Sequence, residues 1–169
     1  MISDTASKSA EPRNVHPRIK TLRQALSFKV AQLAALNERS GSFYFQKALG
    51  LRLNEWRVLG VIVPQGEMLF SELRDALWID KGQLSRVVKS LNEQALIASR
   101  ISDIDARQVT LSVTEKGLET HEKALKFTQS RNDTVVATLT SEECAEFLRL
   151  LDKILQHNEN LGRALREGK

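Results

Sequence analysis

The sequence predicts a mainly α-helical fold with one small β-hairpin, and three observations support this prediction. Apolar residues recur every three or four positions in several segments, as they do in amphipathic helices. Residues 97–102 and 108–113 resemble two strands joined by a loop at 103–107, because apolar and polar residues alternate in the second segment. Two short helices precede this hairpin. This order of elements is typical of a winged helix-turn-helix.

The composition agrees with a globular protein whose core needs no metal ion or disulfide. The chain has 169 residues, of which 41% are hydrophobic and 27% are charged, as in ordinary globular domains. Its net charge of +4 suits a polyanionic partner but is a modest signal. Apolar runs are short and the N-terminus lacks a signal-peptide core, so we expect a cytoplasmic protein without a membrane segment.

The first fifty residues are expected to contain a flexible arm followed by two helices. Residues 1–16 are rich in polar residues and proline, which predicts a flexible arm. Periodic apolar residues predict an amphipathic helix over residues 17–37. Ser40-Gly41-Ser42 is expected to break this helix, and a short aromatic-rich helix over residues 43–48 then ends at Gly50.

The next three helices are predicted from their caps and breakers. Asn54 is expected to cap the first of them, and Pro64 and Gly66 are expected to end it. Residues 71–77 form the second helix. Asp80 is expected to cap the third by accepting hydrogen bonds from backbone N–H groups.

The helix that follows Asp80 has two chemically different faces. Leu84, Val87, Val88 and Leu91 lie on one side and are expected to be buried. The other side carries cations, a hydroxyl group and an amide, which reach phosphates and base edges in a major groove. An isolated charged helix face is usually only solvated, but its place in a helix-turn-helix favours DNA binding. The predicted DNA-binding residues of this helix are Lys81, Gln83, Ser85, Arg86 and Lys89.

Two long helices are predicted at the C-terminal end, and both have a threonine N-cap. Thr114 is expected to cap the first, and Thr140 with Glu143 forms a capping box for the second. Residues 17–37 and 140–166 each carry an apolar stripe that the small module cannot cover. We therefore expect the stripes to pair with each other and with a second subunit. Such a twofold dimer suits a palindromic DNA site.

Several anchors between residues 53 and 117 resemble the MarR family of bacterial transcriptional regulators. They are Leu53-Asn54-Glu55-Trp56-Arg57-Val58-Leu59, Ser71-Glu72-Leu73, Asp80-Lys81, Leu84-Ser85-Arg86-Val87-Val88, Leu91, Leu96, Asp103–Arg107 and Leu111-Ser112-Val113-Thr114-Glu115-Lys116-Gly117. The resemblance implies a homodimer with interlocked terminal helices, a recognition helix over residues 80–94 and a wing over residues 97–113. It also implies that Arg107 enters the minor groove, oriented by Asp105, and that the protein is a repressor released by a small aromatic acid.

The chain departs from the family pattern at four positions. Leu69 stands where a small capping residue is usual. Trp78 and Ala95 stand where glycine is common before and after the recognition helix. Gly82 replaces a small hydroxyl residue and removes one contact to DNA, so the family's base preference is not transferred to this part of the helix.

The predicted organisation assigns a role to each part of the chain. Residues 1–16 form the arm, 17–52 the helices for dimerisation and an effector pocket, 53–117 the DNA-binding module and 118–169 the C-terminal dimerisation helices. The aromatic residues near the start of the module are either core or a pocket for a small aromatic or anionic effector. The residues predicted for this pocket are Phe43, Tyr44, Phe45 and Trp56, with Arg18 as counter-charge.

Other functions are less well supported by the sequence. Cys144 suggests a redox-responsive regulator, but a lone cysteine more often serves packing. His16, His121 and His157 lack the spacing of metal ligands, so no metal or other cofactor is predicted. No nucleophile motif, phosphate loop or acid–base pair indicates an enzyme. A helical scaffold without DNA binding explains the terminal helices but leaves the wing and the basic helix face without a purpose.

Overall fold

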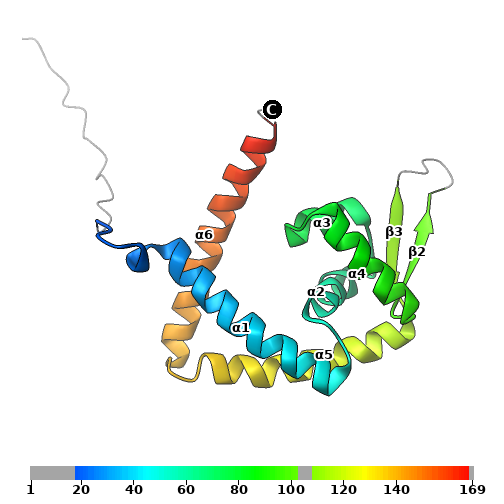
Figure 1. Cartoon of the computed structure of the whole chain (residues 1–169), viewed down its shortest axis with the longest axis horizontal. Helices are drawn as coiled ribbons and strands as arrows, with labels where there is room; N and C mark the ends of the chain where they lie inside the picture. Colours follow the sequence, from blue (N-terminus) through cyan, green and yellow to red (C-terminus); the bar gives the residue numbers. More distant parts are fainter. Residues whose placement is uncertain (1–17, 103–107, 168–169) are drawn as a thin grey trace, which may run out of the picture. The chain divides into compact units, whose positions relative to one another are not determined.

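The computed structural model describes residues 18–102 and 108–167, and helix predominates among them (Figure 1). They divide into two compact units, the first ending at Tyr44 and the second beginning at Phe45. The predicted mainly α-helical fold with a small sheet is confirmed. The arm predicted over residues 1–16 lies outside the described residues. No helix in the described part of the chain is both long and apolar enough to cross a membrane.

The helix α1 (Leu26–Leu49) follows a single 3-10 turn, η1 (Leu22–Gln24), and its course corrects two predictions. It begins nine residues later than residue 17, and it continues through Ser40-Gly41-Ser42 without a break. The Ser40 hydroxyl donates to the carbonyl of Leu36 at 3.1 Å. A serine that bonds back within its own helix does not compete with it, and a single glycine is tolerated there.

The second unit begins at Phe45 within α1, and Gly50 ends that helix as predicted. Its φ of 66° is left-handed, and its N–H donates to the carbonyl of Gln46 at 3.1 Å. The helix α2 (Leu53–Ile62) follows directly. Asn54 is not its N-cap, which corrects the prediction. Arg52 takes that position, and its N–H donates to the Glu55 carboxylate at 2.7 Å.

The helix α2 ends in a 3-10 turn, η2 (Val63–Gln65), which is followed by Gly66 at φ 74°. The predicted end at Pro64 and Gly66 is thereby confirmed. The helix α3 (Phe70–Leu77) has no side-chain cap from Leu69. Instead, Glu72 accepts the Leu69 N–H at 2.9 Å. The helix α4 (Lys81–Glu93) is the predicted recognition helix.

Three antiparallel strands form the sheet, in the order β1-β3-β2. The strands β2 (Ile97–Ile101) and β3 (Val109–Val113) confirm the predicted hairpin. The strand β1 (Glu67–Leu69) was not predicted, because three residues are too few to show an alternating pattern. It pairs with β3, so that Met68 faces Leu111.

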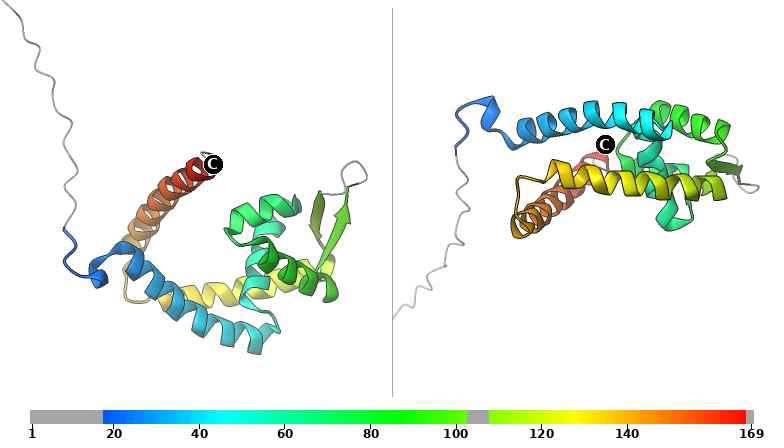
Figure 2. Two further views of the ribbon diagram at one scale, coloured as in Figure 1. Left: turned by 45° about the horizontal axis from the view of Figure 1, so that its top comes forward. Right: turned by 90° about the horizontal axis from the view of Figure 1, so that it is seen from below.

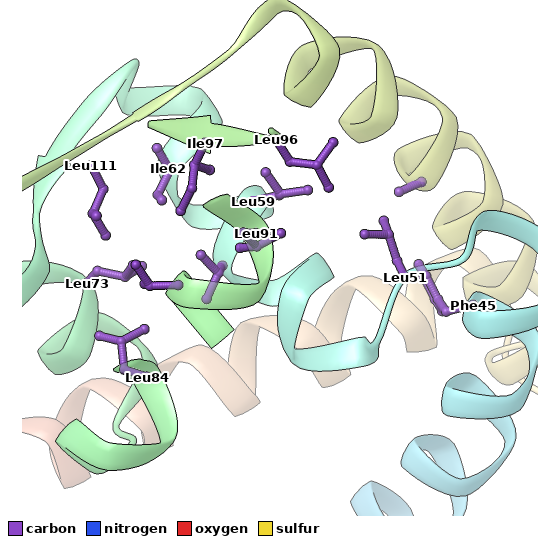
Figure 3. Close-up of a cluster of buried hydrophobic side chains, with 13 residues drawn as sticks. Phe45, Leu51, Leu59, Ile62, Leu73, Leu84, Leu91, Leu96, Ile97 and Leu111 are labelled. Atoms are coloured by element: carbon purple, nitrogen blue, oxygen red, sulfur yellow. The ribbon is translucent and has the colours of Figure 1, made fainter. Parts of the chain in front are cut away.

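The core of the module lies between α2, α3, α4 and the sheet (Figure 3). Leu84 and Leu91 of α4 are fully buried and Val88 is 8% exposed, as predicted for the apolar face of this helix, whereas Val87 is only partly buried. They meet side chains from every neighbouring element of the module. The labelled partners are Leu59, Ile62, Leu73, Leu96, Ile97 and Leu111.

The two C-terminal helices begin at the predicted caps. The helix α5 (Glu115–Val135) packs against α2 (Figure 2), and the Gly117 N–H donates to the Thr114 hydroxyl at 3.0 Å. The helix α6 (Ser141–Glu167) begins with a complete capping box. There the Thr140 N–H donates to Glu143 at 2.9 Å, and the Glu143 N–H donates to the Thr140 hydroxyl at 3.2 Å.

Candidate nucleic-acid interface

The exposed side of α4 gathers the polar residues predicted for DNA binding. Asp80 caps the helix, because its carboxylate accepts the Gln83 N–H at 2.8 Å. Lys81, Ser85 and Lys89 follow one another at four-residue intervals, which places them on one ridge. These three side chains and Arg86 are exposed, whereas Gln83 is half-buried. Four of the five predicted residues are therefore available to a groove.

Lys89 is paired with an acidic neighbour on the same helix. Its ammonium group lies 3.8 Å from Glu93, and the two side chains are 79% and 65% exposed. An exposed ion pair of this kind contributes little stability, typically below about 1 kcal/mol. The ammonium group can therefore leave Glu93 for a phosphate at small energetic cost.

Buried Glu55 fixes the C-terminal half of α4 to α2, a role that the sequence reasoning did not identify. The residue is only 2% exposed. Its Oε1 accepts the Ser90 hydroxyl at 2.7 Å and the Gln94 amide at 3.1 Å. A buried carboxylate is stable only with such donors. In the sequence, Ser90 and Gln94 lie four residues apart near the C-terminal end of α4. This spacing places them on one side of the helix but does not identify Glu55 as the residue to which both bond.

Residues at the start of α5 also bond to the C-terminal end of α4. Lys116 Nζ donates to the Gln94 carbonyl at 2.8 Å. The Thr114 hydroxyl lies 2.8 Å from the Ala95 carbonyl and 3.1 Å from that of Leu96. The Thr114–Gly117 segment therefore has a structural task, which is to anchor the recognition helix and the base of the hairpin.

Left-handed backbone occurs at both ends of the recognition helix, where the family commonly has glycine. Trp78 has a φ of 53° and Ala95 a φ of 56°. Side chains with a Cβ are strained in this conformation. The turns thus keep the glycine-type geometry although neither residue is glycine.

In the predicted wing, the described residues reach as far as Ser102 on one strand and Gln108 on the other. The Ser102 N–H donates to the Gln108 carbonyl at 2.9 Å, which closes the hairpin beside the loop 103–107. Asp105 and Arg107 lie outside the described residues, so their roles stay predictions. Arg100 on β2 is exposed and adds a cation to the wing that the sequence reasoning overlooked.

The residues predicted to form an effector pocket fall into two groups. Phe45 is 3% exposed and belongs to the core, and half-buried Trp56 packs against it, with the two rings stacked at a centroid distance of 6.0 Å. Phe43 and Tyr44 are 61% and 49% exposed and contact each other edge to face at 5.4 Å. Arg18 is exposed. The core interpretation therefore applies to Phe45 and Trp56.

His121 extends this aromatic core on α5. Its ring lies 5.2 Å from that of Trp56, and Phe127 meets Phe45 at 4.9 Å. Burial lowers the pKa of His121, and Glu122 opposes this effect by favouring the charged form. The histidine is therefore held mainly as the neutral form next to the aromatic rings.

Acid is expected to weaken the folded state through His121. Because its folded-state pKa is lowered, the unfolded chain binds the proton more readily, so this contribution to stability is complete above about pH 6.5. It is lost as the pH falls through the folded-state pKa. Thermal melts at several pH values should show that His121→Phe loses less Tm on acidification than the parent. The same change at exposed His157 on α6 is the control. Equal acid sensitivity of His121→Phe and the parent would contradict the assignment.

Comparisons with known proteins agree with this geometry. Residues 49–108 match the MarR family. The HTH-type transcriptional regulator BilQ of Clostridium symbiosum is 34% identical over 83 residues, which span 49% of this chain and 58% of BilQ. The chain thus spans less than two thirds of that relative.

Solved structures show the same fold over most of the chain. A MarR protein from Peptoclostridium difficile has a TM-score of 0.75 at 23% identity, covering 88% of this chain and 96% of its own. A mutant of MarR from E. coli, complexed with operator DNA, has a TM-score of 0.69 at 23% identity, covering 77% and 93% respectively. At these identities, the likeness is one of fold.

Proposed function

Residues 49–108 match the MarR family, and from this premise we propose that the protein is a transcriptional regulator that binds double-stranded DNA through α4. The observation that carries the proposal is the exposed polar face of α4. Its apolar side is buried, and its C-terminal end is held by Glu55 and Lys116. A major groove about 12 Å wide admits such a helix.

Within this proposal, the side chains of α4 have different tasks. Arg86 has the planar fork that recognises a guanine edge. Lys89 provides a mobile charge for a phosphate, as its exposed pair with Glu93 indicates. Arg107 at the wing tip, oriented by Asp105, completes the contact by entering a narrow minor groove.

Replacing Arg86 and Lys89 separately tests the proposal. Arg86→Ala should weaken binding to a DNA fragment that the parent selects from a random pool by about 1–3 kcal/mol, if Arg86 reads a base. Lys89→Ala should weaken selected and scrambled DNA alike and reduce the salt slope by about 1. Fluorescence anisotropy at several salt concentrations measures both effects. Arg107→Ala, assayed beside them, should lose most affinity on A·T-rich flanks. Parent-like affinity in all three variants would exclude the proposed interface.

The exposed apolar faces of the terminal helices support a homodimer as part of this proposal. Contiguous exposed apolar patches mark interaction surfaces, and a twofold dimer presents two copies of α4 to a palindromic operator. The side chains concerned are 37% to 73% exposed. On α6 they are Phe147, Leu148, Leu150, Ile154, Leu155, Leu161 and Leu165, and on α1 they are Leu26, Val30, Leu33 and Leu36.

Ligand-responsive repression is the finer part of the proposal, and the family resemblance supports it. A cytoplasmic repressor is released only by a ligand that binds its DNA-incompetent conformation more tightly. Small aromatic carboxylic acids are the class to test. An effective compound should raise the Tm of the free protein and lower its affinity for the selected DNA. A broad panel that changes neither quantity would remove the effector from the proposal.

A further inference from the structure

Trp78 adopts a backbone conformation that its own side chain disfavours. The residue lies in the turn between α3 and α4, two positions before the cap Asp80, with φ 53° and ψ 36°. Left-handed backbone suits glycine and is unusual for a bulky residue. Local preferences in this turn therefore do not explain a tryptophan.

Gly162 is equally unexpected in its own element. It lies inside the long helix α6 (Ser141–Glu167), five residues before the last helical residue. Glycine weakens a helix interior relative to alanine. Local preferences in α6 therefore favour a residue with a side chain at this position.

These two exceptional residues are in contact with each other. A Cβ atom on Gly162 would lie 2.8 Å from Cη2 and 3.1 Å from Cζ3 of Trp78. The six-membered ring of the indole thus lies against the backbone of α6 at Gly162, and a side chain there would displace the ring, which is 45% exposed. Residues that violate local preferences in a native protein are expected at functional or strained sites.

We propose that Trp78 is a positioning residue, whose indole docks on Gly162 and sets the start of the recognition helix relative to α6. The N-terminal end of a recognition helix is the part that contacts base edges. In this chain that end carries Lys81 and Gln83, directly after the turn that Trp78 occupies. A displacement of α6 is thereby passed to the reading end of α4. This inference rests on the proposed DNA-binding function.

The inference separates sequence discrimination from general affinity for DNA. A misplaced start of α4 disturbs contacts to bases, whereas contacts to phosphates adapt more easily. Trp78→Gly and Gly162→Ala should therefore lower the ratio of the affinities for selected and scrambled DNA. A decrease of about tenfold is within the range of such coupling effects. The double variant should show no larger decrease than either single variant, because both changes remove the same contact.

A control variant and a spectroscopic readout make the experiment specific. Asn160→Ala also strengthens the helical preference of α6, but Asn160 points about 200° around the helix from Gly162. It should leave the discrimination ratio unchanged. The chain has two tryptophans, so fluorine NMR of protein labelled with fluorotryptophan should give two resonances. Trp78→Phe assigns one of them, and Gly162→Ala should shift that resonance much more than that of Trp56.

The outcomes distinguish this inference from the proposed function. Additive losses in the double variant would overturn the inference. So would a lower Tm with unchanged discrimination in the folded fraction, or an unshifted Trp78 resonance in Gly162→Ala. If the parent enriches no sequence from the random pool, the proposed function fails and the inference fails with it. If the parent enriches a sequence and the variants discriminate as it does, only the inference fails.

Discussion

Gly117→Ala is expected to unfold the proposed DNA-binding module or to leave it only marginally stable. A Cβ atom at this position would lie 2.0 Å from the carbonyl oxygen of Leu96 and 2.8 Å from Cγ2 of Val113. The oxygen is backbone, and it accepts the Thr114 N–H at 3.2 Å, so it cannot move without breaking that hydrogen bond. Overpacking of a core typically costs about 1–3 kcal/mol and sometimes more. Here the clash is with backbone, and we expect at least the upper value.

Urea unfolding followed by circular dichroism measures this effect. Gly60→Ala is the matched control, because Gly60 is inside α2 and its nearest atom to an added Cβ is Trp56 Cη2 at 4.0 Å. It should be neutral or stabilise the protein by up to about 1 kcal/mol, since alanine is the better helix former. A Gly117→Ala protein as stable as the parent would show that α5 does not start against the Leu96 carbonyl.

The second large effect is expected when charge enters the apolar face of α6. Leu148 and Leu155 are 49% and 50% exposed and lie seven residues apart, on one side of the helix. Replacing both with glutamate should convert the proposed dimer into a monomer, because burying unpaired charges costs several kcal/mol each. A monomer contacts only one half of a palindromic site, so affinity for selected DNA should fall by about a thousandfold or more.

Light scattering after size-exclusion chromatography measures the mass, and anisotropy measures the affinity. The control is the double change Gln156→Glu and Asn160→Glu, which adds the same charge to the polar side of α6, where both side chains are exposed. This control should remain dimeric and bind DNA as the parent does. A Leu148→Glu, Leu155→Glu protein that stays dimeric at micromolar concentration would contradict dimerisation through α6.

The sequence was most informative where a cap and an apolar period agree. Asp80 followed by the Leu84, Val88 and Leu91 pattern predicted α4 with its cap and its buried side, and Thr114 and Thr140 predicted the starts of α5 and α6. These signals are local, since a capping side chain bonds to backbone within three residues. The elements that depend on them are therefore readable without a structure.

Predictions of helix ends from single residues were wrong where contacts with neighbouring residues determine the end of the helix. Ser40-Gly41-Ser42 reads as a break, but the Ser40 hydroxyl bonds within α1 and the helix continues. Asn54 is a good capping residue in isolation. The N-cap of the helix is nevertheless Arg52, two residues earlier, where Glu55 accepts the N–H of Arg52. Propensities of this kind are weak and are overridden by neighbouring contacts.

The sequence predicted the exposed residues of the candidate site but not the contacts that hold α4 in place. The exposed residues of α4 follow from helical periodicity, which needs only the sequence. The first of these contacts joins Glu55 and Ser90, which are 35 positions apart in the chain. The second joins Trp78 and Gly162, which are 84 positions apart. No local pattern connects such pairs, so their roles become visible only when the fold brings them together.

The hydrogen bonds of Thr114 also affect how well the wing tolerates insertions. The bonds of Thr114 to Ala95 and Leu96 close the hairpin at its base, and the bond between Ser102 and Gln108 fixes the two residues that flank positions 103–107. The entropy of closing a loop grows only logarithmically, so doubling its length costs about 0.6 kcal/mol. Insertions there burden folding very little, while substitutions in α4 are constrained on one side by the core. If the protein reads DNA as proposed, changes between Ser102 and Gln108 are therefore expected to cost less folding free energy than changes in α4.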